Sequence, residues 1–211
     1  MHAHLRSFTG SAQSRHERQK AETKERLYRA ALSLFAERGL AATTVEDITQ
    51  AAGVAKGTFF NYFRTKEQVF SVLIETQLGN VLAAAAEAPQ AGPSTKAILH
   101  RLFLRNAEEF GRGAILTRAL FSSIFLNEAA REITAHGMSE GRRGLAKIIA
   151  LGQQRGEMRA DRKPDSIAFA FQQALFGTAV VWAIQGGGKL ATRLDASFEN
   201  FWAGVAAEAG K

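Results

Sequence analysis

The stretch GVAKGTFFNYFRTK, residues 53–66, places four aromatic rings among two glycines and three cations. Drawn as a helix with about 100° per residue, it puts Phe59 and Phe63 on one side. The other side is small, polar and aromatic: Gly57, Thr58, Phe60 and Asn61. We therefore expect a short helix that anchors two rings in a core and turns its opposite face, with Tyr62 at the edge, toward a partner.

The residues before this stretch, TTVEDITQAAG, contain a capping-box spacing from Thr44 to Asp47 and an overlapping one that starts at Thr43. These spacings predict another short helix, which ends at Gly53. Two short helices joined by a tight turn are typical of a helix-turn-helix, in which the N-terminal end of the second helix enters the major groove of DNA.

The rest of the chain is also expected to be helical, because no strand-period alternation is found. The expected helices lie at about 24–39, 43–53, 56–63, 65–87, 94–111, 113–126, 128–155, 164–185 and 191–209. The segment APQAGPS, residues 88–94, holds two of the three prolines and marks the clearest break. The sequence therefore predicts an all-α fold with a flexible basic arm at 1–20, a helix-turn-helix domain at 21–66 and a helical second part at 67–211.

The charge of the chain favours a polyanionic partner. The 211 residues include 27 Lys and Arg against 20 Asp and Glu, which gives a formal charge of +7. Residues 1–70 hold 11 of these cations and 7 of the anions, so the positive charge is densest in the N-terminal third.

Composition and motifs argue against several other classes of protein. The chain has no cysteine, which excludes disulfides and thiolate metal sites and is typical of the cytoplasm, and its five histidines show no metal-ligand spacing. We find no cofactor loop, nucleophile motif or carboxylate pair, so neither a cofactor nor an enzyme is expected. The N-terminus lacks a secretory signal, and the apolar run 174–184 is shorter than the roughly 20 residues that span a bilayer, so we expect no membrane segment.

Residues 43–70, TTVEDITQAAGVAKGTFFNYFRTKEQVF, closely resemble the N-terminal signature of the TetR family of transcriptional regulators. The resemblance is specific over about 24–73. It implies a homodimer with a three-helix DNA-binding domain and a linking fourth helix. It also implies that 67–211 form a regulatory domain for ligand binding and dimerisation, so that a ligand releases the dimer from a palindromic operator.

The resemblance further implies which side chains contact double-stranded DNA: Thr44, Lys56, Gly57, Thr58, Phe60, Asn61, Tyr62 and Lys66. The Asn61 amide can pair with adenine, and Phe60 can lie against a thymine methyl group. Thr44 and Lys66 would hold phosphates from either side of the recognition helix.

The sequence departs from the family pattern at two positions. Ala55 stands where serine is frequent, so the recognition helix lacks a hydroxyl N-cap, which contributes about 1 kcal/mol. Phe60 stands where tyrosine is more frequent, so it keeps the apolar contact but has no hydroxyl for a phosphate. The basic arm, with Arg6, Arg15 and Lys20 among its cations, either reaches DNA or is only solvated charge.

Two helices of the second part have broad apolar faces that suit a four-helix bundle between two subunits. The residues expected at this dimer interface are Phe171, Leu175, Thr178, Trp182, Leu194, Phe198, Phe201 and Val205. The alternative is that these faces only complete the core of one chain.

The remaining helices are rich in phenylalanine with few polar groups, which suits a pocket for a largely apolar small molecule. The residues expected to line it are Phe103, Asn106, Phe110, Phe121, Phe125, Phe169, Gln172 and Phe176. An ordinary phenylalanine-filled core is the alternative for each ring. Two further functions are kept as alternatives to the ligand-responsive repressor: an all-α small-molecule-binding protein or enzyme, and a non-specific basic nucleic-acid-binding protein.

Overall fold

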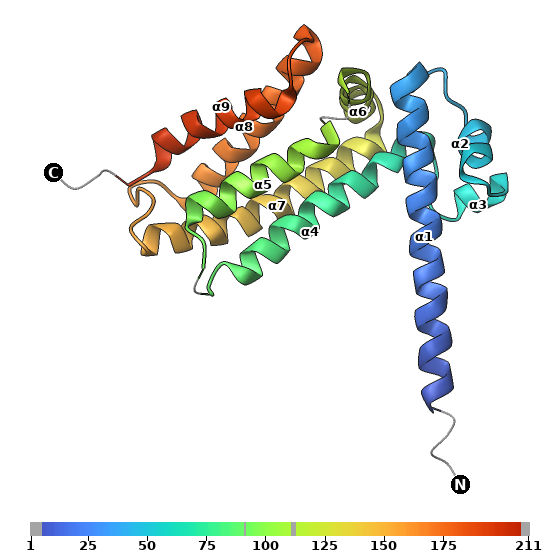
Figure 1. Cartoon of the computed structure of the whole chain (residues 1–211), viewed down its shortest axis with the longest axis horizontal. Coiled ribbons are helices and arrows are strands. Elements are labelled where there is room, and N and C mark those ends of the chain that lie inside the picture. The colour runs from blue at the N-terminus through green and yellow to red at the C-terminus, as the bar shows by residue number, and fades with distance from the viewer. Residues whose placement is uncertain (1–5, 91, 111–112, 208–211) are drawn as a thin grey trace. The chain divides into compact units, whose positions relative to one another are not determined.

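The computed structural model describes residues 6–90, 92–110 and 113–207 (Figure 1), and the side chains of these residues except 6–14, 106–107 and 109–110. Within that part, the chain forms nine α-helices and one 3₁₀ helix, and its β-type pairing is limited to an isolated bridge between Met158 and Ala206. The predicted all-α fold is confirmed. The chain divides into two compact units, Met1–Val69 and Phe70–Lys211.

The first unit consists of α1 (Arg6–Arg38), α2 (Val45–Ala52) and α3 (Lys56–Phe60). Its core is formed by apolar side chains from all three helices and the turn after α3: Leu27, Ala31, Phe35, Ile48, Phe59 and Phe63. The α1 residues recur every four positions, so one stripe of α1 supports the two short helices.

The first helix begins earlier than expected, because the predicted flexible arm at 1–20 is helical from Arg6 onward. Residues 1–5 lie outside the described part of the chain. The stretch 11–26 contains neither proline nor glycine and is rich in strong helix formers. An i,i+4 ion pair also supports this part of the helix, with 3.6 Å between Arg18 Nε and Glu22 Oε1.

The third helix is shorter than expected, since α3 ends at Phe60. The amides of Tyr62 and Phe63 still donate to the carbonyl of Phe59, at 2.9 and 3.0 Å, so the turn continues and Phe63 faces the core. The expected fourth helix begins as a 3₁₀ helix, Lys66–Phe70, and becomes α-helical only in α4, Ser71–Glu87.

The second unit contains α4 and five further helices. These are α5 (Thr95–Phe110), α6 (Ala114–Leu126), α7 (Glu128–Gln154), α8 (Pro164–Gln185) and α9 (Leu190–Val205), and each lies within a few residues of its expected range. Helix α7 packs between α4 and α8, while α9 packs against α8 and α5 (Figure 1). Among the phenylalanines of this unit whose side chains the structure describes, the bundle buries Phe70, Phe103, Phe171 and Phe198.

Glycines on α7 allow an unusually close approach of α4. A Cβ atom at Gly144 would lie 2.7 Å from Cγ1 of Val81, and one at Gly137 would collide with the side chain of Ile74. A third glycine of the same face, Gly141, has room for a Cβ, because its nearest neighbour is Gln172 Nε2 at 3.8 Å. The close contact between α4 and α7, called the α4–α7 seam below, therefore requires glycine at 137 and 144 but not at 141.

Two helices are long and apolar enough to cross a membrane by length and composition alone, 66–87 and 164–185. The apolar run 174–184 was expected to be too short, but the helix that contains it has 22 residues. A core helix passes the same test, and α8 buries Phe171, Leu175 and Ala179 in the bundle. Only 44% of the most apolar window of α8 is buried, so this helix also exposes apolar surface.

Candidate nucleic-acid interface and ligand cavity

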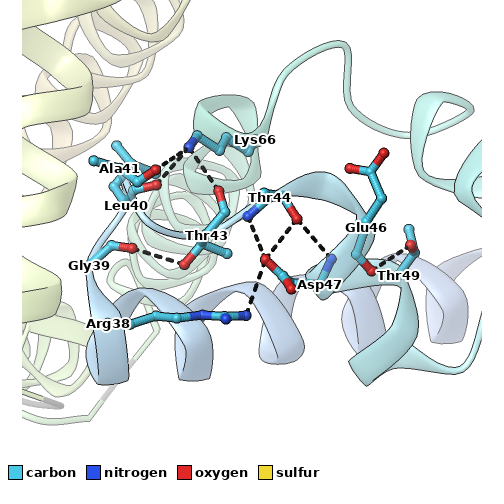
Figure 2. A network of polar contacts seen from close by, with 10 residues as sticks. All are labelled: Arg38, Gly39, Leu40, Ala41, Thr43, Thr44, Glu46, Asp47, Thr49 and Lys66. Carbon is cyan, nitrogen blue, oxygen red and sulfur yellow. Dashed lines mark hydrogen bonds and ion pairs between the residues drawn. The ribbon is translucent and has the colours of Figure 1, made fainter.

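The N-terminus of α2 is closed by a capping box (Figure 2). The backbone amide of Asp47 donates to Oγ1 of Thr44 at 3.1 Å, and the amide of Thr44 donates to Oδ2 of Asp47 at 2.8 Å. The overlapping box expected at Thr43 does not form, because the Thr43 hydroxyl instead donates to the carbonyl of Gly39 at 2.8 Å. Thr44 itself is exposed, as a phosphate-contacting residue must be.

Both acidic side chains in the first turn of α2 are held in their charged form. Hydrogen bonds from the hydroxyl and amide of Thr44, together with the charge of Arg38, hold the pKa of Asp47 below its ordinary value. A hydrogen bond from the Lys56 ammonium likewise lowers the pKa of Glu46. Carboxylates at this end also suit the positive end of the helix dipole.

The structure places Lys66 differently from the expected phosphate contact. Its Nζ donates to the carbonyl oxygens of Leu40 at 2.7 Å and Thr43 at 2.8 Å, and lies 3.4 Å from that of Ala41 (Figure 2). An ammonium group has three donors, so these carbonyls can take all of them. Lys66 therefore ties the start of the 3₁₀ helix to the loop between α1 and α2. This bond could not be predicted from the sequence, because every residue type has a backbone carbonyl that can accept it.

The recognition helix α3 shows the two faces expected from the helical wheel. Phe59 and Phe63 are buried, whereas Phe60 is 50% exposed. The other expected DNA-contacting residues of this segment are exposed or half-buried: Lys56, Gly57, Thr58, Asn61 and Tyr62. Ala55 occupies the N-cap without a side-chain hydrogen bond, as its sequence predicts.

An ion pair links α2 to α3 on the exposed side, between Glu46 and Lys56. The pair is well exposed on both sides, so it contributes little to folding. It nevertheless means that Lys56 must leave a carboxylate before it can meet a phosphate.

A small cavity of about 40 Å³ lies in the second unit between α4, α7 and α8. Gln172 and Phe176, both expected in the pocket, line it, and Gln172 Nε2 donates to the carbonyl of Met138 at 2.8 Å. The larger part of the lining comes from α4 and α7 and was not expected from the sequence: Ile74, Gln77, Leu78, Val81, Gly137, Met138, Gly141 and Leu145. The spacing of the glycines on α7 was the signal that could have located this wall.

The other rings expected in the pocket lie elsewhere. Phe103 is fully buried against Phe171 and Phe198, so it belongs to the core. Phe121 packs edge-on against Phe176, with 6.5 Å between the ring centroids, but does not line the cavity. Two more rings point to the surface, Phe125 at 70% and Phe169 at 45% exposure. The side chains of Asn106 and Phe110 lie outside the described residues.

The residues expected at a dimer interface are corrected by their burial within one chain. Six of the eight are buried there: Phe171, Leu175, Trp182, Leu194, Phe198 and Val205. Thr178 and Phe201 are half-buried, and the Thr178 hydroxyl donates to Ser197 Oγ at 2.9 Å. The physical reason is that α8 and α9 pack on each other and on α5, which was the alternative that the sequence left open.

No cluster of three or more His, Cys, Asp or Glu side chains that could hold a metal ion occurs among the residues that the structure describes. The candidate functional features of the described chain are thus the exposed face of the helix-turn-helix and the cavity of the second unit.

Residues 27–73 match the model of the bacterial regulatory proteins of the tetR family. The chain is 32% identical over 154 residues to the transcriptional regulator AcuR of Cereibacter sphaeroides, covering 69% of each chain. It is 28% identical over 160 residues to the transcriptional repressor KstR2 of Rhodococcus jostii, covering 74% of this chain and 78% of that one.

Among solved structures, the chain is similar to Thermus thermophilus FadR, a transcriptional repressor in complex with lauroyl-CoA. The TM-score is 0.59 at 27% identity, covering 84% of this chain and 92% of that one. The likeness therefore extends beyond the helix-turn-helix to most of the second unit.

Proposed function

Because the chain belongs to the TetR family of bacterial regulatory proteins, we propose that it acts as a homodimeric repressor that leaves a palindromic operator when an apolar small molecule binds. The family is one of DNA-binding transcriptional regulators and not of enzymes, and control by a small-molecule ligand belongs to it. A regulator that works on chromosomal DNA acts in the bacterial cytoplasm.

The exposed face of α3 is the observation that carries the DNA-binding proposal. Phe60 is 50% exposed, whereas Phe59 in the same helix and Phe63 in the turn after it are buried, so one aromatic ring of this segment is open to a partner. Beside it, Asn61 offers an amide that can bond an adenine edge in the major groove. Gly57 has open space around it, which lets DNA approach the backbone of the helix closely.

The residues that contact phosphate are proposed at both ends of this face. Thr44 lies exposed at the N-terminus of α2, and its hydroxyl, which donates to Asp47 Oδ2 at 2.7 Å, can exchange that bond for one to a phosphate. Tyr62 and Thr58 supply hydroxyl groups beside the groove-facing residues, and Lys56 supplies charge once it separates from Glu46. Lys66 is better described as a support for Thr44, since its ammonium is bound to the loop that precedes this residue.

The dimer interface is proposed on the exposed stripe of α8 in place of the buried residues. Phe169, Val181 and Ile184 are exposed apolar side chains on that stripe, and Ile184 reaches 73% exposure. Gly177 lies between them with no neighbour near its missing Cβ, so a second helix can approach closely there. A dimer places two short recognition helices on one palindrome. One such helix alone contacts too few base pairs for specific binding.

Self-association through α8 is tested by Ile184→Glu, measured by sedimentation across protein concentration. We expect this variant to be monomeric, because burying an unpaired charge in an apolar interface is costly. The matched control is Leu126→Glu, which alters an even more exposed apolar residue at the end of α6, 87% against 73%, and should remain dimeric. Equal behaviour of the two variants would exclude the α8 stripe.

The ligand is proposed to carry an apolar chain and one hydrogen-bonding group. The cavity is lined mainly by apolar side chains, with the amides of Gln77 and Gln172 as its polar groups. At about 40 Å³ it has room for only a few water molecules, so a ligand must widen the α4–α7 seam. The lauroyl-CoA bound by the FadR relative makes a fatty acyl-CoA the first candidate class. Such a ligand acts by binding the widened state more tightly than the closed one.

The whole proposal is tested by selecting DNA fragments that the protein retains from a random pool. We expect a short palindrome bound at least 10³-fold more tightly than random DNA. Lauroyl-CoA should then release this DNA, whereas free CoA, which lacks the acyl chain, should not. Equal affinity for selected and random fragments would instead indicate a non-specific basic protein, and turnover of the ligand would indicate an enzyme.

A further inference from the structure

An open groove of about 390 Å³ lies within the first unit, between the N-terminal half of α1 and the recognition helix. One wall consists of four α1 residues, His16, Gln19, Lys20 and Thr23. They recur at three- and four-residue spacing, so they form one continuous face of the helix. The other wall consists of Thr58, Asn61 and Tyr62, from α3 and the turn that follows it.

The lining of this groove has the chemistry of an anion site. Every residue on both walls carries a hydrogen-bond donor, as an ammonium, amide, hydroxyl or imidazole group, and none is a carboxylate. Three acidic residues lie in the same part of α1, and none of them lines the groove: Glu17, Glu22, which pairs with Arg18, and Glu25, which pairs with Arg29. Lys20 forms no ion pair within the described chain, so its charge is available to an incoming anion.

The dimensions suit an extended polyanion better than a single small ion. From His16 to Thr23 the α1 wall rises about 10 Å, at 1.5 Å per residue. Along a DNA strand one phosphate follows another every 3.4 Å of the helix axis, so the wall can follow at most about three phosphates. The opposite wall already contains Asn61, the residue proposed to bond a base edge, which places the groove beside the bases that α3 contacts.

We propose that this groove holds the sugar-phosphate backbone next to the bases contacted by α3, with the N-terminal half of α1 as a second, preformed wall of the DNA site. This inference rests on the proposed DNA-binding function. Lys20 supplies the charge that neutralises a phosphate, while the Gln19 amide supplies a neutral donor that fixes its position. The Thr23 hydroxyl donates to the carbonyl of Gln19 at 2.9 Å and so contributes shape to the wall. Because this wall is helical in the free protein, binding does not require the ordering of a flexible arm.

The test compares Lys20→Ala with Arg18→Ala in the full-length protein, on the selected palindrome and across salt concentration. Both variants remove one positive charge from the same helix, two residues apart, but only Lys20 lines the groove. We expect Lys20→Ala to weaken binding several-fold and to lower the slope of log affinity against log salt by about 0.9, the value for one phosphate contact. Arg18→Ala should leave the slope nearly unchanged. Equal slopes of log affinity against log salt for the two variants would overturn the proposal. Lys20 would then act only through long-range electrostatic attraction.

A second variant, Gln19→Glu, places a carboxylate inside the groove at an exposed position of α1, where the fold tolerates it. We expect a larger loss of affinity than for Lys20→Ala, because the new charge repels the phosphate that the groove holds. Ethylation interference provides a direct readout, since ethylated phosphates that block the wild-type protein should no longer block Lys20→Ala. Unchanged interference in Lys20→Ala would also overturn the proposal.

The wild-type protein separates this inference from the function on which it rests. If wild-type protein fails to select any sequence, the proposed function fails. If it selects a palindrome and the Lys20 and Gln19 variants bind as it does, only the groove fails.

Discussion

The two units of the chain differ in how their functional residues are displayed. In the first unit, the face opposite Phe59 and Phe63 on the recognition helix lies at the surface, as the helical wheel predicts. In the second unit, the rings expected at a dimer interface are mostly buried, while Phe125 and Phe169, expected in a pocket, are exposed. The sequence therefore predicted which faces are exposed in the helix-turn-helix of the first unit and did not do so in the helical bundle of the second.

The reason is the distribution of apolar residues around each helix. Helix α2 is apolar on one side only, so its buried face follows from periodicity. Helix α8 carries Phe171 and Leu175 on its buried side and Phe169 and Val181 on its exposed side. A helix that is apolar nearly all round does not indicate which side meets the core and which side meets a partner.

The largest effect is expected for Phe198→Ala, which tests whether the α8–α9 faces are core. Phe198 is fully buried, with its ring 5.6 Å from Phe103 and 4.7 Å from His100 between centroids. Its truncation should lower the free energy of unfolding by about 3–5 kcal/mol. Denaturant unfolding should show the same loss at every protein concentration.

The matched control is Val181→Ala, on the exposed stripe of α8. Its effect on unfolding at low protein concentration should stay within about 0.5 kcal/mol, because surface substitutions rarely exceed that value. If the loss of unfolding free energy for Phe198→Ala disappears when the protein is diluted, Phe198 contributes to a dimer interface and not to the core of one chain.

The next largest effect is expected for Asn61→Ala, which tests the base-contacting face of the first unit. Loss of a bidentate amide–adenine contact should reduce discrimination at one base pair by about 1–3 kcal/mol. Affinities for palindromes substituted at each position provide the measurement. If affinity for selected and random DNA falls equally, Asn61 contacts only the backbone.

A smaller effect is expected for Lys66→Met, which removes the ammonium but keeps a long apolar side chain. The carbonyls of Leu40 and Thr43 lose a charged donor, so the first unit should be destabilised by about 1–3 kcal/mol. Because no phosphate contact is lost, the salt dependence of DNA binding should match that of Arg18→Ala. If Lys66→Met lowers the slope of log affinity against log salt by about 0.9, Lys66 contacts a phosphate, as the family resemblance implies.

The contrast between Lys66 and Thr44 shows what could be predicted from sequence. The capping box of Thr44 involves side chains three residues apart, so local spacing was enough to predict it. Lys66 bonds carbonyls that precede it by more than 20 residues, and any residue type supplies a carbonyl. The cavity wall on α4 and α7 was missed for a related reason, since it depends on which helices meet. Helix ranges were predictable because caps, prolines and glycines act locally.

A gain of stability is expected for Ala55→Ser, which supplies the missing N-cap of α3. The backbone of Ala55 already has the extended conformation of an N-cap, with φ −69° and ψ 150°, so a serine hydroxyl can accept from an amide of the first turn. We expect the free energy of unfolding to rise by about 1 kcal/mol. As a control, Ala51→Ser places the same residue inside α2, where it should be slightly destabilising. Stabilisation by both would point to a cause other than capping.

The smallest effect is expected from pH, through the capping box at α2. The Thr44 hydrogen bonds and Arg38 lower the pKa of Asp47 in the folded chain below 3.8, its ordinary value, which the unfolded chain retains. Its contribution to stability is therefore fully present above that value and is lost as pH falls through the lower, folded-state pKa. Asp47→Asn should make the loss of stability below pH 4 less steep, while Glu46 and Asp161, whose pKa values are also lowered, keep their share. Unfolding curves that change equally with pH in wild type and variant would show that the Asp47 charge plays no part in closing α2.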